Sequence, residues 1–229
     1  MPSGFRSNLV NLYVLGKNDN ERHFEFQARD LKRIIKDFMP KEVVIDGNGL
    51  GVGLLDFMTR TQFDPKTGET YPAYGSFNDK DMLKTQPKNA IPLIYVIKAS
   101  GKLNSEIHSN CYSQIYAGRV TFLIKEQEAK NKLMATKVGQ KMKVEDRARR
   151  LLPHELTTRL LDECANLRLK DTGNNLDVIL EQINTRFGKD KFSSFEYGLW
   201  RIKELEEEYL KSKARKKGPR KLTFYTPGG

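Results

Sequence analysis

The stretch from Lys41 to Met58 constrains the fold of this chain more than any other. Near its start lies the short apolar run Val43–Ile45, which predicts a buried strand, and this run ends in Asp46. Four alternate glycines follow, and an apolar pattern that suits a helix resumes at Leu54. A strand, a carboxylate at its carboxyl end, a tight turn and a helix are the usual setting of an active site in an open α/β sheet. Asp46 is therefore the first candidate functional residue, although an Asp in this place also closes turns or caps helices.

The glycines after Asp46 do not form a dinucleotide-binding loop. The pattern G-x-G-x-x-G would need its third glycine where the chain has Val52 or Leu54. The sequence also lacks the phosphate-binding pattern G-x-x-x-x-G-K-[ST], so no Walker A loop is predicted. Cys111 and Cys164 are isolated and form no C-x-x-C pair, which indicates neither a zinc ribbon nor a disulfide framework.

The charge of the chain favours a polyanionic partner. The 229 residues carry a formal net charge of +11, which points first to nucleic acid and second to an anionic membrane. No apolar run approaches membrane-spanning length, and the N-terminus has no signal-peptide pattern. We therefore expect a soluble protein with no membrane partner.

Hydrophobic periodicity predicts an α/β order of elements in the first half of the chain. A helix at Phe24–Phe38 lies between two predicted strands, which implies a right-handed crossover and some parallel pairing. The cations of this helix, Lys32 among them, lie opposite its apolar stripe and predict a solvated face. The segment Thr59–Pro92 is rich in turn-forming residues and predicts a long surface excursion with a short helix near Asp79–Thr85. Further predicted elements are strands at Asn8–Leu15, Ile91–Ile97 and Val120–Ile124, and a helix at Ser105–Ala117 that ends at Gly118.

The second half is more strongly charged. Lys125–Arg150 predicts either a mobile helix or loop over a ligand, or a solvated helix. A helix is expected from Leu151 to about Leu167, with a proline near its first turn. Another is expected from Phe192 to about Lys211, with Asp190 just before its first turn in an N-cap position. The tail from Lys211 to Lys221 contains seven basic residues and no acidic one, a composition suited to contacting phosphates or to solubilising the chain.

Two carboxylates from separate elements suggest metal chemistry. Mg²⁺ and Mn²⁺ prefer carboxylate oxygens, and phosphodiester hydrolysis by two such ions needs them about 3.5–4 Å apart. A site of this kind generally contains three or more carboxylates, because two divalent cations need comparable negative charge around them. Asp46 and Asp190 supply two, and the predicted strand at Asn8–Leu15 offers no third.

Three segments resemble the nuclease domain of tailed-phage terminase large subunits. The stretch Val43–Gly51, followed by Leu55-Asp56, resembles the second acidic motif of that family. The stretch Lys189–Ser194, followed by Tyr197-Gly198-Leu199, resembles the third acidic motif. The block Tyr95–Ile124 resembles the middle region of the family, and the resemblance as a whole covers roughly residues 9 to 210.

The resemblance implies an RNase H-like α/β fold, with a mixed sheet flanked by helices, over residues 1–210 and a basic tail over 211–229. It implies a two-metal endonuclease, with Mg²⁺ or Mn²⁺, that cuts concatemeric double-stranded viral DNA in the cytoplasm of an infected bacterium. Its partners would be that DNA, the terminase ATPase, the small terminase subunit and the portal. Asp46 and Asp190 would be catalytic metal ligands. Cations expected to contact DNA are Lys189 and Lys191 beside the third motif, and Lys213, Arg215, Lys216 and Lys217 in the tail.

The sequence departs from the family in one respect. The family has a first acidic residue on a strand upstream of the segment matched by Leu9–Leu15, and this chain does not contain it. We therefore expect a C-terminal portion of a longer protein, or one product of a divided gene, whose sheet lacks its first strand. Cleavage by the chain alone is expected to be weak or absent unless another polypeptide supplies that strand. The alternative is a non-catalytic DNA-binding or assembly fragment of the packaging motor. A generic basic DNA-binding protein would leave the glycine-rich motif unexplained.

Overall fold

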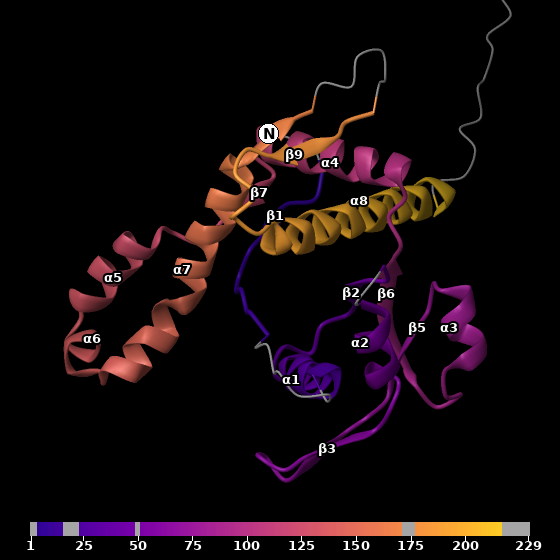
Figure 1. Ribbon diagram of the computed structural model, residues 1–229, viewed down its shortest axis with the longest axis horizontal. Coiled ribbons are helices and arrows are strands. Elements are labelled where there is room, and N and C mark those ends of the chain that lie inside the picture. Colours follow the sequence, from indigo (N-terminus) through magenta and orange to yellow (C-terminus); the bar gives the residue numbers. More distant parts are fainter. Residues whose placement is uncertain (1–3, 16–22, 49–50, 171–176, 217–229) are drawn as a thin grey trace, which may run out of the picture.

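A computed structural model of the chain describes residues 4–15, 23–48, 51–170 and 177–216, and it has a mixed α/β fold (Figure 1). The largest sheet has three parallel strands in the order β2 (Val43–Asp46), β6 (Ile91–Ile97) and β5 (Tyr74–Ser76). The strand β6 lies in the middle, as its nearly continuous apolar sequence predicts. Asp46 is in register with Ile97, so β2 and β6 end together.

Helices cover both faces of this sheet, as the alternation of side chains along β6 requires. Ile94 and Val96 face a core shared with α1 (His23–Phe38) and α2 (Gly51–Met58). Ile97 and the partly buried Tyr95 face the other way, toward α4 (Gly101–Tyr116) and α8 (Asp190–Lys216). The sheet is therefore the middle layer of a three-layer arrangement (Figure 1).

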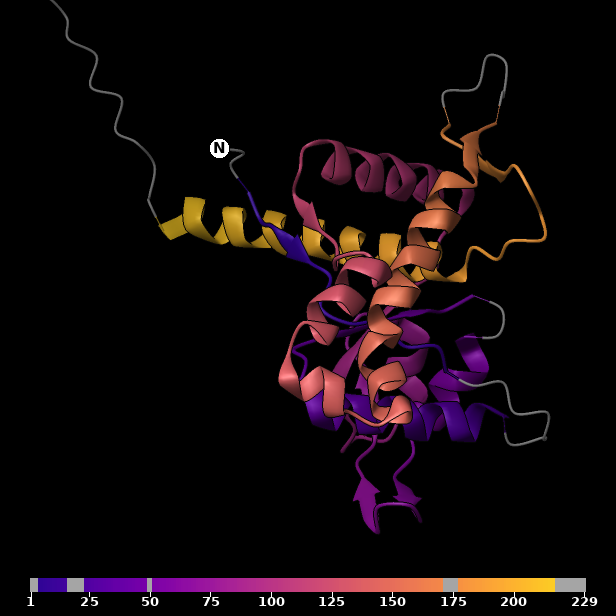
Figure 2. The ribbon, with the colours of Figure 1, turned by 90° about the vertical axis from the view of Figure 1, so that its left-hand side faces the viewer.

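A further core lies on the far side of α8 from the sheet. Helices α4 and α8 pack together there with α7 (Val144–Ala165), as Figure 2 shows from the side. Two small sheets border this core. They are the parallel pair β1 (Ser7–Asn8) and β7 (Val120–Thr121), and the antiparallel pair β8 (Leu167–Leu169) and β9 (Leu180–Gln182).

Three helices form an arm that projects from the body (Figure 1). They are α5 (Glu126–Met134), α6 (Lys137–Lys141) and the N-terminal half of α7. The expected helix start at Leu151 is wrong, because α7 begins at Val144 and contains Pro153 in its interior. Packing of α5 against α7 stabilises a helix that the missing proline N–H would otherwise interrupt.

The segment expected to be a surface excursion is only partly exposed. It contains the hairpin β3 (Gln62–Asp64) and β4 (Glu69–Tyr71), the strand β5 of the main sheet, and α3 (Lys80–Thr85). The short helix α3 is where the sequence predicted it, and Asp79 caps it by accepting from the N–H groups of Asp81 and Met82. The buried residues Tyr71 and Ser76 contradict a fully solvated loop.

Other differences concern the ends of elements. The strand expected at Asn8–Leu15 is limited to Ser7–Asn8, and the strand expected at Val120–Ile124 is limited to Val120–Thr121, because these segments pair only with each other. The helices predicted at Phe24–Phe38 and Ser105–Ala117 are present as α1 and α4. The last helix runs beyond the expected end at Lys211, so α8 passes through position 210 without a break.

Candidate functional site

The carboxyl ends of the three parallel strands bring polar side chains to one edge of the sheet. Asp46 ends β2, Lys98 follows β6, and Asn78 and Asp79 follow β5. Ligands of open α/β sheets bind outside this kind of edge. The edge is therefore the candidate functional site of the molecule.

Asp46 is exposed and held by its own turn. Its Oδ1 accepts a hydrogen bond from the N–H of Asn48 at 2.9 Å, and the N–H of Gly47 donates to the carbonyl of Ile97 at 2.7 Å. Burial raises the pKa of Tyr197 of α8 to about 12, and the nearby negative charges of Asp46 and Glu196 contribute further, so the Asp46 carboxylate lies near this residue. The turn thus presents a carboxylate between the sheet and α8.

Two of the glycines after β2 are required by close approach of other atoms. A Cβ on Gly51 would lie 1.7 Å from the carbonyl oxygen of Asp46. A Cβ on Gly47 would lie 2.4 Å from Val96 Cγ1 and 3.0 Å from Lys98 Cγ. The glycine-rich motif therefore allows the turn to fold tightly beside Asp46 and Lys98.

The pair formed by Lys98 and Asp79 was not predicted from the sequence. Lys98 Nζ lies 2.5 Å from Asp79 Oδ2, and the hydrogen bond raises the pKa of Lys98 and lowers that of Asp79. Since the stem of Lys98 passes over Gly47, this cation stands beside the turn that holds Asp46. A lysine directly after the apolar run of β6 was the signal that could have indicated it.

Asp190 is the first residue of α8, and its side chain is exposed. The helix is capped by a different carboxylate: buried Glu163 of α7 accepts from the N–H of Phe192 at 2.9 Å and from Lys191 Nζ at 2.7 Å. Within the described chain, the carboxylate of Asp190 makes no side-chain hydrogen bond or ion pair. The N-cap interpretation of Asp190 is therefore replaced by capping from α7, which sequence reasoning missed.

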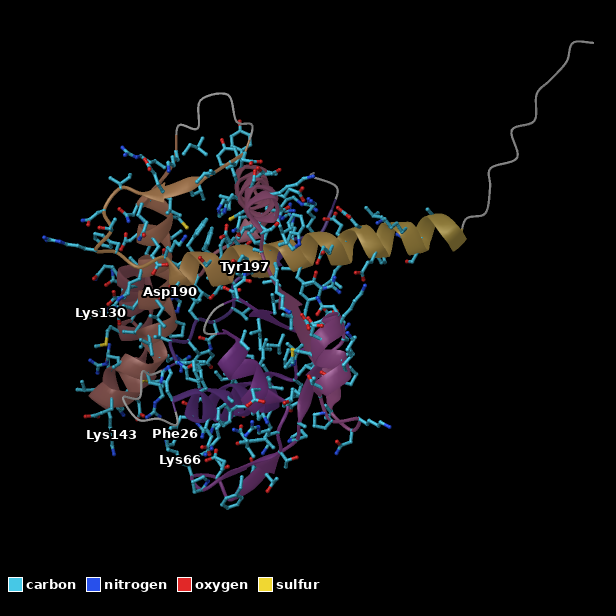
Figure 3. All side chains as sticks on the ribbon, turned by 45° about the vertical axis from the view of Figure 1, so that its right-hand side comes forward. Phe26, Lys66, Lys130, Lys143, Asp190 and Tyr197 are labelled. Carbon is cyan, nitrogen blue, oxygen red and sulfur yellow. The ribbon has the colours of Figure 1, made fainter. Side chains whose placement is uncertain are left out.

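Asp46 and Asp190 lie near different parts of α8. Asp46 lies near Tyr197, whereas Asp190 is the first residue of the helix. Asp190 and Tyr197 are seven residues apart, so they share one face of α8 at a spacing of about 10 Å along its axis. The charge of Asp46 contributes to the raised pKa of Tyr197, which Figure 3 shows further along α8 than Asp190. Within the described parts of the chain, no three His, Cys, Asp or Glu side chains are grouped closely enough to hold a metal ion.

The cations predicted to contact DNA differ in their surroundings. Lys191 is engaged with Glu163, whereas Lys189 is exposed. Lys213 is exposed, and its Nζ lies 5.1 Å from the ring centroid of Tyr209. Arg215 and Lys216 belong to the last turn of α8, and Lys217 lies outside the described residues.

A second polar cluster lies between α4 and α8. His108 Nδ1 and the buried Glu196 Oε2 are 2.6 Å apart, next to Cys111 and Cys164. Burial, with Glu196 as a further contribution, raises the pKa of the Cys111 thiol to about 12. Because thiolates are the reactive form of cysteine, this arrangement makes Cys111 an inert core residue.

The fold and this edge define a mixed α/β protein whose acidic and basic side chains meet at the carboxyl end of a parallel sheet. A scan against protein-family models found no match to the chain, and searches of the curated proteins and of the solved structures found none either. No helix among the described residues combines the length and apolar character needed to cross a membrane.

Proposed function

We propose that this chain is the nuclease portion of a viral DNA-packaging terminase large subunit, with an RNase H-like fold that another strand completes. One observation carries the proposal: the exposed Asp46 ends a parallel strand, β2, that packs beside α8, the helix that begins at Asp190. The order of the two acidic motifs and the net charge of +11 agree with a nuclease that acts on DNA.

The number of carboxylate ligands determines whether the described residues can hold two metal ions. Asp46 and Asp190 offer carboxylate oxygens, the ligand type that Mg²⁺ and Mn²⁺ prefer. Two carboxylates do not match the charge of two divalent ions, and the described residues place no third beside them. The residues that the structure describes therefore do not make up a complete two-ion site, and a further acidic residue is required beside Asp46 and Asp190.

The open edge of the main sheet offers a place for that residue. Among the described strands, β2 pairs with β6 alone, so its other edge is unpaired. An unpaired edge is a template on which a strand of another polypeptide can add. A strand added along this side of β2 would run beside Asp46. An acidic residue on it would bring a carboxylate to the carboxyl end of the sheet, where Asp46 lies.

Cleavage of supercoiled plasmid in Mn²⁺ tests the proposal. We expect weak or no cutting by the purified chain, and cutting when an upstream polypeptide with a strand-borne Asp is added. Asp46→Ala and Asp190→Ala should abolish the restored activity, whereas Asp162→Ala, on the exposed side of α7, should leave it unchanged. Restored cutting that survives both substitutions would remove the basis of the proposal.

A second candidate is a non-catalytic DNA-binding fragment of the packaging motor. The lack of a third acidic ligand among the described residues favours it. This candidate predicts DNA binding by the chain but no cleavage with any upstream polypeptide, so the same plasmid assay separates the two.

A further inference from the structure

The arm carries more positive charge than its own fold needs. We define the basic arm as residues 125–150, which include α5, α6 and the first two turns of α7. It contains nine Lys or Arg residues and four Asp or Glu residues. A short segment of this kind concentrates charge on a projecting part of the molecule, away from the sheet (Figure 1).

Most of these cations are exposed and have no acidic partner. The ion pairs of the basic arm among the described residues join Lys132 to Glu128 at 2.7 Å and Arg149 to Asp146 at 3.9 Å. Arg147 instead donates to the carbonyls of Gly139 and Met142. The remaining cations are exposed and take part in no ion pair within the described chain: Lys125, Lys130, Lys137, Lys141, Lys143 and Arg150.

Arg147 ties α7 to α6 through two backbone carbonyls, but the six cations that make no ion pair within the described residues do not hold the basic arm together. Between α5, α6 and α7 lies a cavity of about 450 Å³ whose lining is partly apolar, with Ala129, Leu133 and Leu151, and partly polar, with Lys132, Thr136, Arg150 and His154. Capping by Thr136, whose hydroxyl accepts from the N–H of Gly139 at 3.0 Å, secures α6. The fold of the arm is accounted for by these contacts, which leaves its outer charge available for a partner.

The composition of the basic arm favours double-stranded nucleic acid. Residues 125–150 contain no Phe, Tyr or Trp, so they lack the aromatic side chains on which the bases of a single strand usually stack. A membrane-surface helix would present a broad apolar face with aromatic residues or leucine. Here the strongly exposed apolar side chains are two valines, Val138 and Val144. Cations without aromatic residues suit the phosphates of a duplex.

The arm lies on the same side of the molecule as the start of α8 (Figure 3). Helix α7 leads from the basic arm to Glu163, whose carboxylate binds Lys191 and the N–H of Phe192 at the start of α8. Lys130 and Lys143 lie on the same side of the molecule as Asp190 (Figure 3). A duplex held on the arm would therefore lie on the side of the molecule that bears Asp190.

We infer that the basic arm binds the phosphate backbone of double-stranded DNA without reading its sequence. The inference rests on the proposed function only in taking DNA as the substrate. Its test measures DNA binding in EDTA and not cleavage. DNA binding by the arm can therefore be refuted while the cleavage proposal is confirmed, or confirmed while that proposal is refuted.

The test is fluorescence anisotropy of a labelled duplex with the full chain in EDTA, at KCl concentrations from roughly 50 to 200 mM. The triple variant Lys137→Gln, Lys141→Gln and Lys143→Gln should bind at least tenfold more weakly at the lower salt. The slope of log K against log salt should become shallower by about 0.9 for each phosphate that the variant no longer binds, or roughly 2–3 in all. Both the weaker binding and its salt dependence should be similar for duplexes of unrelated sequence.

The matched control removes three exposed lysines elsewhere, with Lys84→Gln, Lys88→Gln and Lys102→Gln. It should change affinity less than twofold. A Lys→Arg triple at positions 137, 141 and 143 should restore binding, and circular dichroism should give the wild-type spectrum for each variant. Equal losses of affinity in the arm and control variants would overturn the inference. So would a loss confined to vesicles of anionic lipid with duplex binding unchanged.

Discussion

Lys32 is the residue at which burial and charge conflict most. It lies on α1 and is 0 % exposed, although its place in the sequence predicted a solvated face. Its Nζ donates to the carbonyl of Arg60 and lies 6.0 Å from the ring centroid of Tyr74. Burial lowers the pKa of Lys32 from 10.5 to about 8, because no carboxylate compensates for the water that the ammonium loses.

The lowered pKa of Lys32 predicts a pH-dependent stability. Below pH 8 the residue is protonated in the folded and the unfolded chain, and the folded state bears the full desolvation of the charge. Between about 8 and 10.5 the folded chain releases the proton while the unfolded chain keeps it, so folding becomes more favourable as pH rises. Relative to Lys32→Met, wild-type stability should rise in this window by up to about 1.4 kcal/mol per pH unit.

Urea denaturation of the wild type and of Lys32→Met across this window measures the difference. Taking the difference removes the titration of other groups, such as Cys111 and Tyr197, whose raised pKa values lower stability at high pH. A difference that stays constant from neutral pH to pH 10.5 would contradict the assigned pKa.

Among the secondary-structure elements, the contact between β2 and α2 depends on Gly51. Its missing side chain allows the first turn of α2 to approach the carbonyl oxygen of Asp46. A backbone oxygen cannot rotate away as a side chain can, so any larger residue must move α2 or the turn. The position of Asp46 relative to α8 is therefore coupled to the packing of a helix on the opposite face of the sheet.

Gly51→Ala should destabilise the protein by about 1–3 kcal/mol, the usual penalty for forcing an atom into a packed region. Gly198→Ala is the matched control, because a Cβ on Gly198 meets no atom within 4 Å and α8 is a helix. The control should be neutral or more stable by up to about 1 kcal/mol, since alanine restricts the unfolded chain. Chemical denaturation of both variants gives the comparison, and equal stabilities would show that α2 adjusts without strain.

Across the molecule as a whole, α8 connects the packed regions. Leu199 belongs to the core with α4 and α7, while Trp200 packs with Ile97 of β6 and Ile107 of α4. Arg201 binds Glu42 at 2.7 and 3.1 Å and so ties α8 to the start of β2. With these interactions on consecutive residues, the regions on either side of α8 cannot separate without unfolding this part of the helix.

The single tryptophan of the chain makes this coupling measurable. Trp200 is 8 % exposed at the junction, so its fluorescence changes when the junction opens to water. We expect the fluorescence transition in urea to coincide with the transition in far-UV circular dichroism, which follows all the helices. Two separated midpoints would mean that the regions on the two sides of α8 unfold independently.

Much of the element order was predictable from the sequence, because hydrophobic periodicity is local. The strand β6 has the bounds predicted for it, and α1 and α4 follow from residues at helical spacing. Periodicity failed at Pro153, where packing of α5 against α7 overrides the local preference to end a helix. It also failed for β5, a three-residue strand recognisable only by its pairing with β6.

The candidate site also has features that local sequence predicts and features that only the tertiary structure provides. Local sequence was enough to predict that Asp46 ends a buried strand beside a tight glycine turn, since both features depend on neighbouring residues. The meeting of Lys98 and Asp79 at this edge, and the capping of α8 by Glu163 rather than Asp190, arise only in three dimensions. Those contacts join residues about 20 to 30 positions apart in the chain. They form only when parallel strands and crossing helices place them together, because no local pattern specifies which distant backbone will be near.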